Sequence, residues 1–84
     1  MTTQQITAEI AALADDMNVD RYATAKLNAA AAALAAGDID AAEEAADAAA
    51  ELLWSTVRDD DEGDREDLAQ NASHIVDMIA DLNA

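Results

Sequence analysis

Residues that interrupt a helix are nearly absent from this chain of 84 residues. It contains no proline and only two glycines, Gly37 and Gly63. Strands favour β-branched and aromatic residues, and the turns between them need glycine or proline. Tyr22 and Trp54 are the only aromatic residues. The sequence therefore disfavours an all-β fold and predicts helices that are separated by a few short breaks.

Apolar residues repeat with the period of a helix in several segments. Ile6, Ile10, Leu13 and Met17, for example, follow one stripe of a helix at spacings of four, three and four residues. Asp20, Asp38, and Asp64 or one of its neighbours are suited to N-cap positions, and Gly37 is suited to the residue that follows a helix end. We expect four helices at residues 3–17, 21–36, 39–57 and 65–82.

These four helices predict a single domain over residues 1–84, a small all-α four-helix bundle built from antiparallel hairpins. The third and fourth helices are amphipathic, as the surface helices of a bundle should be. The core side of the third helix is predicted to comprise Ile39, Ala42, Ala46, Ala49, Leu53 and Val57. The core side of the fourth helix is predicted to comprise Leu68, Ala72, Ile75, Ile79 and Leu82.

The second helix is apolar nearly all round, because Lys26 is its only charged residue between Tyr22 and Ala36. Such a helix is normally buried, so we expect it to lie at the centre of the bundle. A compatible alternative is that a second copy of the chain covers part of it, forming a two-fold homodimer. The residues predicted for this self-association are Tyr22, Ala25, Ala29, Ala32 and Ala33.

The charge of the chain restricts its partners. Nineteen acidic and four basic residues give a formal net charge of −15 at pH 7, which disfavours direct binding to nucleic acid or to an anionic membrane. A composition rich in aspartate and alanine and poor in lysine resembles that of proteins from extreme halophiles, where salt screens repulsion within about 3 Å at 1 M. A GC-rich genome or a functional acidic surface are the alternative explanations.

An unbroken acidic stripe lies on the predicted outer side of the third helix. Asp40, Glu44, Asp47 and Glu51 follow one another every three or four residues, which places successive carboxylates roughly 4.5–6 Å apart along the axis. This spacing predicts either a solvated face or a mimic of nucleic-acid phosphates that binds a protein with a basic groove. Trp54 lies beside the stripe, where it either anchors such a partner or covers the edge of the core.

Residues for catalysis or metal binding are not arranged in any familiar pattern. The chain lacks cysteine, and His74 is its only histidine. Aligning Gly63 with the glycine of an EF-hand loop places Arg58 and Ala69 where that loop needs carboxylates. We therefore expect no catalytic residues, no metal site and no cofactor.

A local resemblance concerns the segment between Lys26 and Leu52. The sequence from Gly37 to Ala42, Gly-Asp-Ile-Asp-Ala-Ala, is followed by Ala49 and Leu52. It resembles the middle of a tetratricopeptide-type helical hairpin, in which a turn leads into a second helix lined with small residues. The resemblance implies an antiparallel hairpin and hints at peptide binding.

Together these features predict a small acidic, non-enzymatic helical module for protein–protein interaction that self-associates as a homodimer. The alternative is an acidic nucleic-acid mimic that inhibits a DNA- or RNA-binding protein, as some virus-encoded proteins do. No segment resembles a signal peptide or a membrane span, so we expect a soluble protein of the cytoplasm.

Overall fold

A computed structural model describes residues 2–16, 19, 21–57 and 64–83 of the chain. The described residues form four helices and no strand, as the sequence predicts. The helices are α1 (Thr3–Ala14), α2 (Arg21–Ala35), α3 (Ile39–Ser55) and α4 (Asp64–Asn83).

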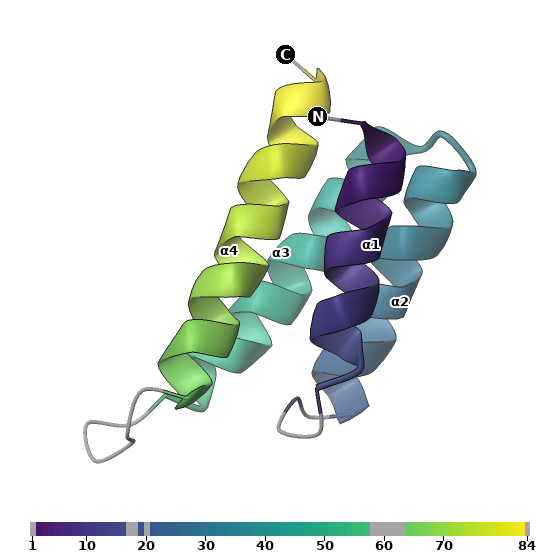
Figure 1. Ribbon diagram of the computed structural model, residues 1–84. Helices are drawn as coiled ribbons and strands as arrows, with labels where there is room; N and C mark the ends of the chain where they lie inside the picture. Colours follow the sequence, from purple (N-terminus) through teal and green to yellow (C-terminus); the bar gives the residue numbers. More distant parts are fainter. Residues whose placement is uncertain (1, 17–18, 20, 58–63, 84) are drawn as a thin grey trace.

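The four helices run alternately up and down, and each packs beside the next one along the chain (Figure 1). The contact of α1 with α4 closes the ring, and it is the smallest of the four contacts between neighbouring helices. The first and last helical turns lie at the same end of the bundle (Figure 1). The predicted all-α bundle of antiparallel hairpins is thereby confirmed.

The turn between α2 and α3 forms as the sequence predicts. Gly37 has a φ of 81°, a left-handed conformation that glycine adopts without steric penalty. The Asp38 N–H donates to the Ala33 carbonyl at 2.9 Å and the Gly37 N–H donates to the Leu34 carbonyl at 3.1 Å, which is the Schellman pattern of helix termination. The Asp38 side chain then accepts a bond from the Ala41 N–H, which caps α3.

Helix α1 begins with a capping box that involves Thr2 and Gln5. The Thr2 hydroxyl accepts from the Gln5 N–H at 3.2 Å, and the Gln5 side chain accepts from the Thr2 N–H at 2.9 Å. The predicted end of this helix at residue 17 is wrong, because α1 ends at Ala14. The Asp16 N–H donates to the Leu13 carbonyl, so the chain tightens after Ala14 and leaves the α-helical path. Met17 and the predicted cap Asp20 lie outside the described residues.

Helix α3 ends two residues before the predicted boundary, at Ser55. The Ser55 and Thr56 hydroxyls donate to the carbonyls of Leu52 and Leu53, and the Thr56 N–H also donates to the Leu53 carbonyl, so these bonds close the last turn of the helix. Helix α4 extends one residue beyond the prediction at each end, so Asp64 is its first residue and not the cap that precedes it. Of the frame considered as an EF-hand loop, residues 58–63 lie outside the described residues, and residues 64–69 form the start of α4.

The core lies along the axis of the bundle and is built from all four helices. Its largest fully buried side chains are Ile6, Ile10, Leu27, Ile75 and Ile79. The predicted core sides of α3 and α4 are confirmed, with Ile39, Val57 and Leu82 partly buried at their ends. Alanine supplies four of the five residues that α3 buries, and these small side chains let neighbouring backbones approach closely while burying little apolar area.

The expectation that the second helix is central is wrong. Within the described residues, α2 packs against α1 and α3 but makes no contact with α4. It buries only Ala23, Leu27, Ala30 and Leu34, which is one narrow stripe at helical spacing. The outer side of α2 is rich in alanine and lacks acidic residues. Alanine forms helices well whether it is buried or exposed, so the lack of charge did not indicate a buried helix.

Candidate interaction surfaces

The outer side of α2 presents most of the residues predicted for self-association. Tyr22, Ala25, Ala29 and Ala32 are exposed and lie on one stripe of the helix, at spacings of three, four and three residues. We call these four residues the alanine face. Tyr22 has 63% of its surface exposed. Ala33, the fifth predicted residue, is half-buried and packs against the core, so it lies at the margin of this face.

The segment that carries the alanine face contains no carboxylate. Between Arg21 and Gly37 the only charged residues are Arg21 and Lys26, and both are exposed. The Arg21 guanidinium carbon lies 5.3 Å from the centroid of the Tyr22 ring, which is within the range of a cation–π contact. In a chain of net charge −15, the exposed side of α2 therefore carries two basic residues and no acidic one.

Helix α3 carries the predicted acidic stripe on its solvent side. Asp40, Glu44, Asp47 and Glu51 are all exposed. The first three, together with Glu43 and with Val76 of α4, line a shallow recess of about 330 Å³. We call it the acidic recess. It gathers four carboxylates around one apolar side chain, so it is suited to a positively charged group with an aliphatic stem.

Trp54 joins α3 to α4 instead of standing free beside the acidic stripe. Its indole Nε1–H donates a hydrogen bond to the Ser73 hydroxyl of α4 at 2.8 Å. The side chain remains 41% exposed. The polar edge of the ring is therefore used within the chain. Both predicted roles of Trp54, an anchor for a partner and a cover for the edge of the core, stay predictions.

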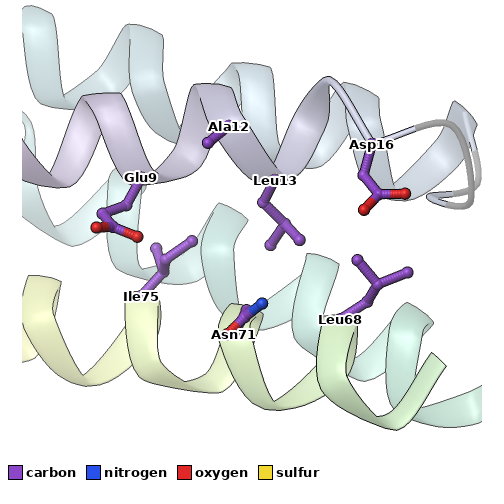
Figure 2. Close-up of a pocket in the computed structure, with 7 residues that line it drawn as sticks. All are labelled: Glu9, Ala12, Leu13, Asp16, Leu68, Asn71 and Ile75. Atoms are coloured by element: carbon purple, nitrogen blue, oxygen red, sulfur yellow. The ribbon is translucent and has the colours of Figure 1, made fainter. Parts of the chain in front are cut away.

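A groove runs between α1 and α4, where the contact between neighbouring helices is smallest. It encloses about 180 Å³. Figure 2 shows Glu9 and Asp16 of the α1 segment at its two ends, with Leu13 and Asn71 between them. We call it the α1–α4 groove. Its lining residues are Glu9, Ala12, Leu13, Asp16, Leu68, Asn71 and Ile75.

Neither metal binding nor membrane insertion gains support from the described residues. Nowhere among them do three histidine or acidic side chains come close enough to hold a metal ion. His74, the only histidine, is exposed on α4. Within the same part of the chain, no helix has the length and apolar character needed to cross a membrane.

Comparison with known proteins leaves the function to be argued from the surfaces alone. The chain matches no protein family model, no curated protein and no solved structure. The hairpin implied by the tetratricopeptide resemblance is present as α2 and α3, whereas the resemblance to that family stays a prediction.

Sequence reasoning missed two features that involve α4. The α1–α4 groove depends on how closely two helices approach, and no periodicity in the sequence reports that distance. The bond between Trp54 and Ser73 joins residues 19 positions apart. Its one available signal was the general tendency of a partly buried tryptophan N–H to find an acceptor.

Proposed function

We propose that this protein is a small, acidic, non-enzymatic interaction module of the cytoplasm that self-associates as a homodimer through the alanine face of α2. The observation that carries the proposal is an exposed helix face without carboxylates in a chain of net charge −15. The large excess of acidic residues over the remaining surface suits a salt-rich environment, where screening is short-ranged.

Electrostatics favours this face over the outer side of α3 for the approach of a second copy. Two copies that meet through α3 would bring Asp40, Glu44 and Asp47 of each chain together, and close carboxylates repel one another. Two copies that meet through α2 bring together a helix face that carries no carboxylate of its own and two basic residues, Arg21 and Lys26. A two-fold dimer uses the same patch twice, so one face is sufficient for closure.

An antiparallel arrangement of the two α2 helices adds a favourable charge pair. If the two-fold axis passes beside Ala29, residue 21 of one copy lies opposite residue 37 of the other, because both are eight positions from the axis. Arg21 then approaches Asp38 of the second copy at a shallow crossing angle of about 20°. Asp38 is exposed and acts as the N-cap of α3 through a bond to the Ala41 N–H.

The size of the face predicts a weak dimer. A helix of 15 residues is about 22 Å long, and exposed alanines contribute little area each. A standard stable interface buries about 800 Å² on each partner, which is roughly 15% of the 5202 Å² exposed by this chain. We therefore expect a dissociation constant in the range of about 1 to 100 μM in high salt.

Analytical ultracentrifugation in about 0.1 M and about 1–2 M salt tests the proposal, because screening changes strongly between these concentrations. A larger fraction of the chains should be dimeric at the higher salt concentration. Ala32→Glu should weaken it by placing a carboxylate on the shared face, whereas Ala8→Glu adds the same charge at an exposed site of α1 and serves as the control. A folded monomer at high concentration in 1–2 M salt, or equal effects of the two variants, would overturn the proposal.

The antiparallel arrangement has its own test, a double-mutant cycle between Arg21 and Asp38. Arg21→Gln removes the positive charge, and Asp38→Asn removes the negative charge while keeping a side chain that caps helices equally well. Each single variant should weaken the dimer. The double variant should lose less free energy of dimerisation than the sum of the losses of the two single variants. Additive losses would rule out the pair and leave the choice of face untouched.

A second candidate function rests on the acidic recess. Asp40, Glu43, Glu44 and Asp47 surround a concavity instead of a flat face, which favours a mimic of nucleic-acid phosphates that inhibits a protein with a basic groove. The test is capture of proteins from lysate at low and high salt. A nucleic-acid-binding protein that is retained at low salt, and lost with the double variant Glu44→Gln/Asp47→Asn, supports the mimic. If the double variant still retains that protein at low salt, the mimic function is refuted.

A further inference from the structure

The α1–α4 groove combines an apolar floor with charged ends, and neither the dimer nor the acidic recess uses it. Leu13, Leu68 and Ile75 line it, and their side chains belong to the core cluster. The three residues are only 6%, 6% and 2% exposed, so the floor is fixed by packing. The volume of about 180 Å³ is roughly that of six water molecules in the liquid, which suits a slender ligand.

The ends of the groove are negatively charged. Glu9 and Asp16 are separated by five residue steps of α1 and two steps of the tighter turn that follows it, so their backbones lie roughly 11 Å apart along the axis. Both side chains point toward the groove from its opposite ends (Figure 2). Asn71 of α4 lies between them (Figure 2), and its side-chain amide offers an acceptor as well as two donors.

We propose that the α1–α4 groove binds a linear aliphatic polyamine with an ammonium group at each end. Each terminal ammonium would bind one of the two carboxylates, and the methylene chain would lie on the floor formed by Leu13, Leu68 and Ile75. The Asn71 carbonyl oxygen would accept a hydrogen bond from an internal ammonium. The separation of the carboxylates argues against a metal ion, because a cation that binds both of them directly needs them a few ångströms apart.

The proposal predicts selection by length. Nine bonds separate the terminal nitrogens of spermidine, which gives an extended length of about 11 Å with bonds of about 1.5 Å. This length spans the two carboxylates. Putrescine has five bonds between its nitrogens and reaches only about 6 Å on the same basis, so it would bind one carboxylate at a time. The compound 1,8-diaminooctane matches spermidine in length but lacks the internal nitrogen that Asn71 would recognise.

Calorimetry and amide NMR titration in about 0.1 M salt test the proposal, with spermidine, putrescine and 1,8-diaminooctane as the probes. Spermidine should bind in a ratio of one to one, more tightly than putrescine, and should shift amide signals of α1 and α4. Glu9→Gln and Asp16→Asn should each weaken spermidine binding about two- to five-fold, which is the range for one exposed ion pair. Asn71→Ala should weaken the binding of spermidine but leave the binding of 1,8-diaminooctane unchanged.

The control is Glu51→Gln, which removes the same charge from an exposed site on α3, a helix that makes no contact with α1 among the described residues. It should leave spermidine binding nearly unchanged. Equal losses for Glu9→Gln and Glu51→Gln, or binding of several polyamines per chain without preference for length, would show general attraction to a negative protein and overturn the proposal.

Discussion

Two neighbouring leucines on α3 provide a sharp test of which side of that helix faces the core. Leu53 is 3% exposed and belongs to the core cluster, whereas Leu52 is 37% exposed. The two residues have the same side chain, lie in the same helix and differ by one position. Replacing each by alanine therefore removes the same atoms from two environments and leaves the helix propensity and the net charge of the chain unchanged between the variants.

The expected loss of stability differs several-fold between them. Leu53→Ala removes buried atoms and leaves a cavity, which costs about 2–5 kcal/mol in the free energy of unfolding. Leu52→Ala leaves no enclosed cavity, because solvent already reaches that side chain, and its partial burial predicts a loss of about 1 kcal/mol or less. A domain of 84 residues has a total stability of about 4–13 kcal/mol, so Leu53→Ala removes a large fraction of it.

Circular dichroism at 222 nm during urea and thermal unfolding measures both variants against the parent chain. A change of 1 kcal/mol shifts the melting temperature of a domain of this size by about 4–8 °C, so Leu53→Ala should lower it by at least about 8 °C. Leu52→Ala should lower it by less than about 8 °C. Equal destabilisation of the two variants, or a larger loss at Leu52, would refute the assignment of the inner side of α3.

Three further predictions concern charge and the α2–α3 turn. Raising salt from about 0.05 M to 1 M should raise the melting temperature, because screening weakens repulsion within a chain of net charge −15; a flat or falling melting temperature would contradict this. Glu44→Ala should leave the free energy of urea unfolding unchanged or raise it, since it removes one of several like charges on α3; a loss above about 1 kcal/mol would contradict the proposed repulsion. Gly37→Ala should lower that free energy by about 1–2 kcal/mol through the left-handed backbone alone, because a Cβ there meets no atom within 4 Å. Gly37→Asn should lower it less, and equal losses for the two would point to a cause other than backbone conformation.

The helices and their central turn could be predicted from the sequence because local physics determines them. Gly37 and Asp38 act through their own backbone and nearest neighbours, so the helix end, the turn and the next cap follow from two adjacent residues. The inner stripes of α3 and α4 followed from apolar spacing. The end of α1 was less predictable, because the choice between another α-helical turn and the tighter turn at Asp16 involves small differences in local energy.

The position of α2 could not be predicted because alanine carries little information about burial. Exposing an alanine such as Ala29 or Ala32 costs little, since its methyl group has a small apolar area. A helix that lacks charge is therefore compatible with the centre of a bundle and also with its surface. In α2 the residues that decide are Leu27 and Leu34, which are large and lie on the single stripe that faces α1 and α3.

The two proposed functions predict salt dependences of opposite sign, and this follows from where the charges lie. The alanine face itself carries no carboxylate, so the force that opposes association of two copies is repulsion between the rest of the two molecules, and salt weakens that repulsion. A basic partner held at the acidic recess is attracted by Asp40, Glu43, Glu44 and Asp47, and salt weakens that attraction. The screening length falls from about 14 Å at 0.05 M to about 3 Å at 1 M, so whole-molecule forces act at the lower concentration and only direct contacts at the higher one. Association that strengthens across this range identifies α2 as the surface in use, and association that weakens identifies α3.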